Sequence, residues 1–303
     1  MTGAGPLVSV IIPFFQQDDY LLEAVESSAN QTYENLEIVV VDDCSPGRSA
    51  GEILSVCRVP RLKVLRHEEN LGPSAARNTA VAHSSGEFIL PLDADDKISL
   101  EYLATTVAAF QDDPELGAVY TSAQLFGDED NIWHPQTSVS YLLCNGSPNT
   151  FLYRRELFDA LGGYKPYLRL GENTDFWLRA QLSGWRFLHI DRPLYFYRKH
   201  RGGITSTESC FGDRARILVR EHRELVANRL EEILLEQTQR YCEQIAAYDA
   251  LREQYMQLHA EVTERWDQLN HYYEHHLQAT PARKGGLLGA LTSLFKMRQA
   301  TNK

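Results

Sequence analysis

Long apolar runs are missing from this sequence: it contains no stretch of eighteen consecutive apolar residues, so we expect no membrane-spanning helix. The first seven residues also lack the basic segment and the long apolar segment of a secretory signal peptide. CxxC and Cys/His metal spacings are absent as well, because the odd set of cysteines is scattered: Cys44, Cys57, Cys144, Cys210 and Cys242. Such isolated thiols are typical of a reducing cytosol, and we expect a cytoplasmic protein.

Positive charge is in deficit, since 30 Lys and Arg residues face 41 Asp and Glu residues for a net charge of -11. A surface of that sign repels a phosphate backbone, so we expect no nucleic-acid partner. Apolar residues make up 43% of the composition, which is ordinary for a soluble globular protein. A chain of 303 residues with this composition can bury a full-sized core and has room for about two domains.

The first 210 residues alternate short apolar runs with helical patterns, as in a mostly parallel sheet flanked by helices. We expect strands at 8–12, 38–41, 62–65, 88–90 and 118–123. We expect helices from an N-cap at Asp18 or Asp19 to about Gln31, from Ser74 to about His83, and from Leu100 to Phe110. Residues 1–210 are therefore predicted to form one α/β domain.

Glycine and proline disappear between Gly212 and Pro281, and good helix formers dominate there, so one or two long helices are expected over 211–280. One side of this region carries apolar residues at three- and four-residue steps: Tyr241, Ile245, Tyr248, Tyr255, Val262, Trp266, Leu269 and Tyr273. Arg252, His259 and His276 interrupt that row. Such helices either join copies of the chain in a coiled coil or fold back on the same chain, and the sequence leaves both open.

Acidic residues are absent after Glu274, and the tail at 281–303 is basic. Its apolar residues fall at helical spacing, and Arg283, Lys284, Lys296 and Arg298 flank them: Leu287, Leu288, Leu291, Leu294 and Phe295. A short basic amphipathic helix of this kind can make peripheral contact with the inner face of a membrane. The alternative is a terminal helix docked on its own protein.

Acidic side chains follow two of the predicted strands. Asp43 comes directly after the run at 38–41, and Asp93, Asp95 and Asp96 come shortly after the run at 88–90. In open α/β sheets ligands bind at the carboxyl ends of the strands. We therefore expect these carboxylates to lie at one edge of the sheet.

Three carboxylates within four residues repel one another and need a cation or strong donors to coexist in the ionised form. Mg²⁺ or Mn²⁺ bound to a diphosphate meets that need, because these hard cations prefer oxygen ligands and keep positions open for phosphate. Such a metal acts as a Lewis acid on a departing nucleoside diphosphate. The alternative is that Asp95 or Asp96 caps the helix that follows.

Eight motifs occur in a fixed order along the chain. They are Val8–Phe15, Gln31–Tyr33, Val40–Ser45, Asn70–Asn78, Leu92–Asp96, Gly162–Tyr164, Gly171–Arg179 and Tyr197–His200. With this order and spacing, residues 7 to 207 resemble the inverting glycosyltransferases of family two. The resemblance implies the Rossmann-like GT-A fold, here followed by a long helical C-terminal extension, and a nucleotide-sugar donor used with Mn²⁺ or Mg²⁺.

The resemblance also implies a nucleotide site. Pro13 and Phe15 would line the base pocket, with Phe15 offering a stacking face, and Asp43 would accept a hydrogen bond from the base, commonly a uracil. Arg77 would hold the nucleotide near its phosphates, and Asp93 would approach the ribose or the metal. A carboxylate can accept a hydrogen bond from an imide N–H, and a guanidinium can donate hydrogen bonds to a phosphate. The alternatives are a simple turn at Asp42 and Asp43 and a surface helix charge at Arg77.

Three further residues are implied as metal contacts: Asp95, Asp96, and His200 after the last strand-like run. His200 would add a contact to the metal or the diphosphate. Its alternative is an ordinary loop histidine.

The sequence departs from the resemblance at the catalytic base. The family usually has the Asp of a Glu-Asp pair near a helix start, and this chain has Glu172 followed by Asn173. Asn173 is a neutral amide and cannot take a proton from an acceptor hydroxyl. Three interpretations stay open: Glu172 is the base, Asp175 is the base on a shifted helix, or the protein binds nucleotide sugar without transferring it.

Three functions compete. A nucleotidyltransferase would carry a Gly-rich basic loop after the first strand, whereas this chain has Pro13–Gln17 there. A degenerate scaffold would use the long helices to recruit partners while its nucleotide site only binds. We favour a metal-dependent inverting glycosyltransferase that moves a sugar from a nucleotide-diphosphate sugar, with UDP-sugar as the expected donor, to a glycan, lipid-linked or protein-linked hydroxyl.

Overall fold

The computed structural model describes residues 5–145, 147, 150–200 and 208–276. The chain divides into two compact units that meet in the sequence between Gln237 and Thr238. The first unit holds the whole sheet together with the helices that pack on it. The domain boundary expected at residue 210 thus falls inside this unit.

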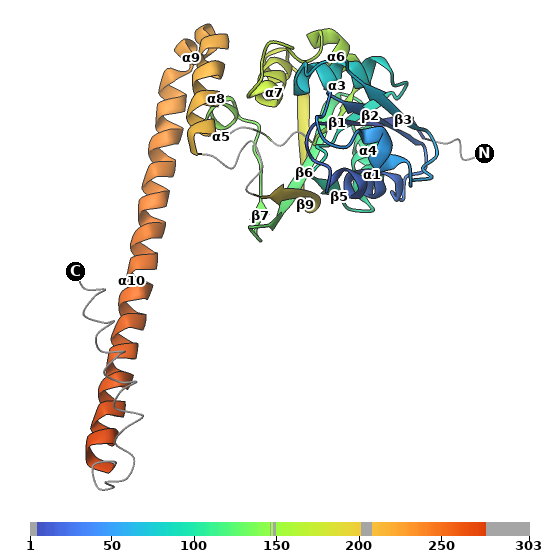
Figure 1. Ribbon diagram of the computed structural model, residues 1–303. Helices are drawn as coiled ribbons and strands as arrows, with labels where there is room; N and C mark the ends of the chain where they lie inside the picture. Colours follow the sequence, from blue (N-terminus) through green and yellow to red (C-terminus); the bar gives the residue numbers. More distant parts are fainter. Residues whose placement is uncertain (1–4, 146, 148–149, 201–207, 277–303) are drawn as a thin grey trace. The chain divides into compact units, whose positions relative to one another are not determined.

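The described strands form one nine-stranded sheet in the order β3-β2-β1-β4-β8-β6-β9-β5, with β7 paired to β6 (Figure 1). Their bounds are β1 (Val8–Phe14), β2 (Leu36–Asp42), β3 (Leu62–Arg66), β4 (Phe88–Pro91), β5 (Lys97–Ile98), β6 (Leu116–Gly127), β7 (Ile132–Trp133), β8 (Leu152–Arg154) and β9 (Arg186–Lys199). The first four strands along the chain are parallel, and β8 runs antiparallel to both β4 and β6. The sheet is therefore mixed, and its parallel part is the half that carries the acidic motifs.

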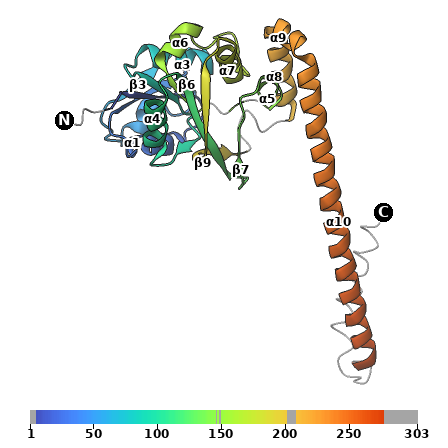
Figure 2. The same ribbon diagram turned by 180° about the vertical axis from the view of Figure 1, so that it is seen from behind.

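Helices cover both faces of the sheet, and Figures 1 and 2 show α1 on one side and α3 and α6 on the other. The helices of the first unit are α1 (Leu21–Ala29), α2 (Ala50–Leu54), α3 (Pro73–Ala82), α4 (Tyr102–Asp112), α5 (Val139–Asn145), α6 (Arg155–Leu161), α7 (Glu172–Leu182), α8 (Glu208–Glu221) and α9 (Arg223–Asn228). One core contains residues of α1, α2 and α4, and the other contains residues of α3, α5, α6, α7 and α8. This layering is the α/β arrangement that the sequence predicts.

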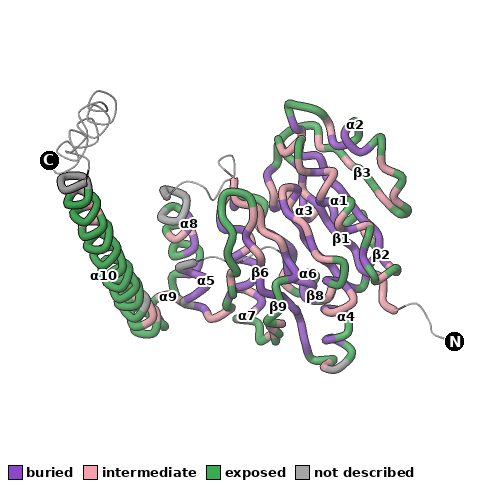
Figure 3. Tube along the Cα trace, turned by 90° about the horizontal axis from the view of Figure 1, so that it is seen from below, coloured by how far each residue is buried: buried purple, intermediate pink, exposed green. Residues whose placement is uncertain are grey.

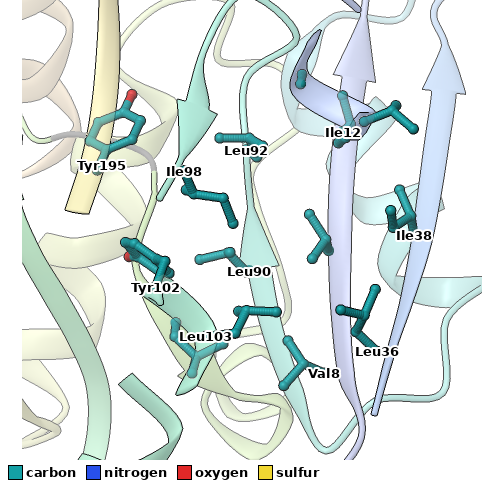
Figure 4. Packing of buried hydrophobic residues seen from close by; sticks show 14 of the residues in the cluster. Val8, Ile12, Leu36, Ile38, Leu90, Leu92, Ile98, Tyr102, Leu103 and Tyr195 are labelled. Atoms are coloured by element: carbon teal, nitrogen blue, oxygen red, sulfur yellow. The ribbon is translucent and has the colours of Figure 1, made fainter. Parts of the chain in front are cut away.

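The apolar runs of β1 and β2 divide their side chains between these two cores. Ile12 and Ile38 belong to the core under α1 and α4, whereas Ile11 and Val39 belong to the opposite one. Figure 4 shows Ile12, Ile38 and Leu90 of three neighbouring strands in the first core. Strands buried on both faces read as continuous apolar runs, and each large side chain buried there contributes about 1.5–3 kcal/mol.

One predicted helix start is wrong and another is confirmed. Helix α1 begins at Leu21 without a side-chain cap, because the Asp18 carboxylate instead accepts the Arg48 backbone N–H at 3.0 Å. Helix α3 begins at Pro73, one residue before the expected start at Ser74, and Pro73 occupies the first turn, where proline is favoured. Gly72 precedes it with a φ of 90°, a conformation that L side chains rarely adopt.

The long helix expected after residue 211 is confirmed as α10 (Leu230–His276), which follows α8 and α9. No helix among the described residues is both long and apolar enough to cross a membrane. The tail at 281–303, for which we predict membrane contact, lies outside the described residues.

Candidate active site

Three parallel strands deliver the predicted nucleotide-binding residues to one edge of the sheet. Strand β1 lies between β2 and β4 and is parallel to both. Phe15 follows the end of β1, Asp43 follows β2, and Asp93 lies just after β4. The carboxyl ends of these strands share an edge, so the expectation that the acidic clusters share it is confirmed.

Phe15 is 38% exposed, so part of this residue is open to solvent at the strand end. Pro13 lies within β1, paired in register with Val41, and is partly buried. The chain turns directly after Phe15, where Gln16 has a φ of 57° and its backbone N–H donates to Ser45 Oγ at 3.0 Å. An exposed ring on a rigid strand end is suited to stacking against a planar base.

Asp43 is buried and organises the loop that leads into α3. Its carboxylate contacts His67 Nδ1 at 2.7 Å and accepts the backbone N–H groups of Leu71 at 2.9 Å and Gly72 at 2.7 Å. A carboxylate offers about four lone-pair sites. These three contacts leave one site that can accept a base N–H.

The neighbouring residue, Asp42, stabilises a turn, which is the alternative given above for Asp42 and Asp43. It accepts the backbone N–H of Ser45 at 2.8 Å and that of Ala50 at 3.0 Å, and it also pairs with Arg66. These contacts fix the chain after β2 and so hold Asp43 in place.

A buried guanidinium joins two predicted site residues that are distant in the sequence. Arg77 on α3 donates to Asp93 Oδ1 and to Glu172 Oε1, both at 2.8 Å. Burial by itself would lower the pKa of Arg77, but the charges of Asp93 and Glu172 outweigh it and raise that pKa. Arg77 Nε is buried without a hydrogen-bond partner, so this guanidinium has one N–H that can still donate a hydrogen bond.

Glu172 is the first residue of α7, and Gly171 gives the chain its entry to that helix. Gly171 has a φ of 79°, and a Cβ there would lie 2.9 Å from Arg214 Cγ on α8. The described hydrogen bond of Glu172 uses Oε1, and the residue is only slightly exposed. Its neighbour Asn173 has a buried Oδ1 with no hydrogen-bond partner, so this departure from the family pair leaves an unsatisfied acceptor beside Glu172.

Asp95 and His200 lie together, with Asp95 Oδ2 and His200 Nε2 3.0 Å apart. Burial raises the pKa of Asp95, and the charge of Asp93 raises it further. A nearby cation would relieve both effects.

Asp96 occupies a different environment from Asp95. Its carboxylate is buried and accepts the Tyr195 hydroxyl and the Arg198 backbone N–H, the latter at 2.8 Å. Burial raises its pKa well above the usual value, and the charges of Asp95 and Asp93 add to the rise. Because β9 already donates one hydrogen bond to each of its oxygens, Asp96 has fewer free acceptor sites for a metal, and it does not cap α4, which begins six residues later.

A divalent metal fits Asp95 and His200 only as part of a shared site. Among the described residues, no group of three or more His, Cys, Asp or Glu side chains is arranged to hold an ion. Mg²⁺ and Mn²⁺ sites on diphosphates commonly use one or two protein ligands and complete their shell with phosphate and water. The pair therefore fits a metal that arrives with a diphosphate.

Asp175 is fully buried and faces α8 and the loop before α7. Its carboxylate contacts Lys165 Nζ at 2.8 Å, Arg179 Nε at 2.8 Å and His222 Nε2 at 3.0 Å. Burial alone would raise the pKa of Asp175, but hydrogen bonds from His222 and Lys165 and the charge of Arg179 lower it to about 2. Such a carboxylate is a weak base, so the structure disfavours Asp175 as the proton acceptor.

Sequence reasoning missed the residues that hold this site together. Arg198 Nε donates to the Asp95 carbonyl at 2.7 Å, and its side chain also pairs with Glu23. The motif Tyr197–His200 was the available signal for Arg198. His222 had no such signal, because it contacts Asp175 from the junction between α8 and α9, beyond every recognised motif.

Comparisons with known proteins agree with this geometry. The family model described as glycosyl transferase family 2 matches residues 9–175. Glycosyltransferase GlyA of Streptococcus pneumoniae is 29% identical over 222 residues, which cover 65% of this chain and 31% of that protein. The uncharacterized glycosyltransferase EpsJ of Bacillus subtilis is 29% identical over 220 residues, which cover 66% of this chain and 63% of that protein. The chain thus spans less than two thirds of the length of these relatives.

Solved structures show the same fold. TarS of S. aureus (residues 1–349), in complex with UDP-GlcNAc, is 28% identical with a TM-score of 0.55 and covers 65% of this chain and 59% of that one. The mannosyltransferase PcManGT of Pyrobaculum calidifontis, in complex with GDP-Man and Mn²⁺, is 22% identical with a TM-score of 0.53, over 66% of this chain and 59% of that one. The fold is GT-A, and because the family model spans more than half of the 303 residues, the chain belongs to glycosyl transferase family 2.

Proposed function

We propose that this protein transfers a sugar from a nucleoside diphosphate sugar to an acceptor hydroxyl, with inversion and with the help of a divalent metal. The observation that carries the proposal is the buried Arg77 that bridges Asp93 and Glu172. In this proposal Arg77 binds phosphate and Glu172 is the base. Arg77 contacts both Glu172 and Asp93, the carboxylate on the side of the sugar donor. A degenerate scaffold without catalysis is not favoured by the family relationship.

The donor is proposed to be a UDP-sugar. The TarS neighbour is in complex with UDP-GlcNAc, and PcManGT is in complex with GDP-Man. In this chain the exposed ring of Phe15 would stack on the base, with Pro13 lining the pocket. The remaining acceptor capacity of Asp43 suits the imide N–H of a uracil. Asp93 would meet the ribose or the metal.

The metal, Mn²⁺ or Mg²⁺, would be held by Asp95 and His200 and would supply Lewis-acid stabilisation of the leaving diphosphate. Arg77 adds positive charge on the same side of the reaction, where negative charge grows as the bond to the sugar breaks. Glu172 takes the proton of the acceptor hydroxyl as that oxygen attacks the anomeric carbon. Asp96 and Asp175 hold the flanking segments in place.

The acceptor is proposed to be a hydroxyl of a glycan, a lipid-linked sugar or a glycosylated protein. Helix α7 presents Glu172 at its first turn, so the acceptor hydroxyl has to approach the N-terminus of α7. Binding measurements with a panel of UDP-, GDP- and dTDP-sugars would identify the donor. Hydrolysis of the bound donor in Mn²⁺ would separate a transferase from a protein that only binds.

The change Asp95→Asn tests the metal assignment. We expect donor binding to lose most of its dependence on Mn²⁺, with an apparent metal affinity at least about tenfold weaker, because one anionic ligand is gone. Isothermal titration of UDP at increasing Mn²⁺ concentrations measures this directly. The control Asp159→Asn removes an exposed carboxylate on α6. Unchanged Mn²⁺ dependence in Asp95→Asn would remove Asp95 from the metal site.

A further inference from the structure

Helix α10 carries an apolar row that repeats every seven residues. The row consists of Tyr241, Tyr248, Tyr255, Val262 and Leu269. Leu251 and Leu258 follow two of its members by three residues, which gives alternating steps of three and four. We refer to these seven residues as the heptad seam. A strict seven-residue repeat keeps facing a partner only if the helices wind around each other with a left-handed supercoil.

The outer face of α10 has the opposite character. Five residues after Leu234, Tyr241, Tyr248, Tyr255 and Val262 come positions that lie away from the seam, and they are Gln239, Ala246, Glu253, Ala260 and Asp267. None of these five is a large apolar residue. The helix is therefore amphipathic with the heptad period, and its apolar residues are concentrated on one side.

The heptad seam is exposed to solvent. Its five first-position side chains are between 55% and 67% exposed, and Figure 3 shows α10 coloured as exposed along most of its length. Three tyrosines, a valine and a leucine in a continuous row form an apolar surface of a kind that marks an interaction site. Most helices gain their stability by packing an apolar face, and this one spans 47 residues.

We propose that α10 pairs with α10 of a second copy of this chain in a left-handed two-stranded coiled coil. A second copy supplies a seam of the same period and length, which a symmetric dimer requires. If the six tyrosines of two copies each bury about 150 Å², they contribute about 900 Å² before the leucines and valines are counted. Adding those residues brings the total into the range of about 1,200 Å² or more that stable complexes bury.

The chain's own tail is too short to cover the heptad seam. Seam residues 241 to 269 extend over about 42 Å of helix at 1.5 Å per residue. The apolar stripe of the tail runs from Leu287 to Phe295 and, as a helix, would extend over about 12 Å. The tail would leave most of the row in water, whereas a second α10 covers all of it.

Polar residues limit where the two helices can meet. Gln244 and Arg265 occupy the positions where the pattern of Leu251 and Leu258 would place an apolar side chain. The strongest contact is therefore centred on residues 248 to 262. If one helix were shifted by one heptad along the other, the polar residues at the two ends of this core would lie against apolar residues of the partner helix. Such shifted registers are therefore disfavoured.

Sedimentation equilibrium of the full chain over about 1–100 μM tests this pairing. We expect the wild type to approach twice the mass of one chain as its concentration rises, with a typical micromolar affinity. The double variant Tyr248→Glu/Tyr255→Glu keeps good helix formers and places four like charges in the contact. It is expected to remain a single chain over the whole range.

The matched control is Ala246→Glu/Ala260→Glu, which adds the same two carboxylates to the outer face of the same helix. It is expected to keep the mass of the wild type. A wild type that stays a single chain at 100 μM, or a seam variant that associates as strongly as the control, would overturn the proposal. A mass above that of two chains would overturn the two-stranded form. The readout is independent of sugar transfer, so its failure leaves the proposed function untouched.

Discussion

Replacing Glu172 by Gln is expected to lower the rate of sugar transfer by about 10²- to 10⁴-fold, the usual contribution of a general base, while donor binding stays close to that of the wild type. Glutamine keeps a side-chain oxygen that can accept the Arg77 hydrogen bond now made by Glu172 Oε1 at 2.8 Å. The buried cation thus stays partly satisfied while the proton acceptor is lost. Transfer under saturating donor and acceptor, together with titration of UDP, separates the two effects.

The expectation rests on the contrast among three neighbouring side chains. Asn173 has no basic group, and Asp175 has a pKa lowered to about 2 and is 0% exposed. Of the two carboxylates in the first turn of α7, Glu172 is the one that contacts the Arg77 guanidinium, which would face the diphosphate. Its longer side chain replaces the shorter one of the usual Asp.

The matched control for this change is Glu156→Gln, which removes an exposed carboxylate at the start of α6. It is expected to transfer sugar at the wild-type rate. Normal transfer by Glu172→Gln would remove Glu172 from the chemistry. Reduced transfer with an equally large loss of UDP binding would instead assign Glu172 to supporting Arg77.

Most of the fold could be read from the sequence because its signals are local. The continuous apolar run of β2 predicts a strand buried on both faces, and Asp43 directly after it falls at the carboxyl edge. The Gly72-Pro73 pair likewise marks the start of α3. Each of these features depends on residues that are close together in the chain.

The assignments that changed depend on partners far away in the sequence. Asp96 looks like a metal ligand beside Asp95, but Tyr195 and Arg198 satisfy it from about one hundred residues later. Asp18 looks like a helix cap, but its carboxylate accepts a hydrogen bond from the backbone N–H of Arg48. A carboxylate has several possible partners, and only the tertiary fold decides which one it meets.

The change Asp175→Asn is expected to lower the free energy of unfolding of the catalytic unit by about 3 kcal/mol, because removing one member of a buried ionic cluster leaves the others uncompensated. Lys165, Arg179 and His222 all contact this carboxylate within 3.0 Å. The midpoint of thermal unfolding should fall by about 6–12 °C for a unit of this size. Urea unfolding followed by tryptophan fluorescence measures the loss, since Trp177 is buried on the same helix.

The loss should depend on pH in a defined direction. The folded-state pKa of Asp175 is about 2, below the ordinary value of 3.8 that applies to the unfolded chain. The stabilisation is therefore complete above pH 3.8 and disappears as the pH falls through 2. The difference between wild type and Asp175→Asn should be constant from pH 7 to 5 and then shrink by up to about 2 kcal/mol.

Asp213→Asn on α8 is the matched control, because Asp213 and its partner Arg216 are both exposed. An exposed ion pair contributes less than about 1 kcal/mol, so this variant should unfold almost like the wild type at every pH. If Asp175→Asn unfolds like Asp213→Asn, the cluster does not hold α7 and α8 together. If it is destabilised as expected, His222→Ala should weaken the same cluster, because His222, directly after the end of α8, contacts Asp175 on the helix that begins with Glu172.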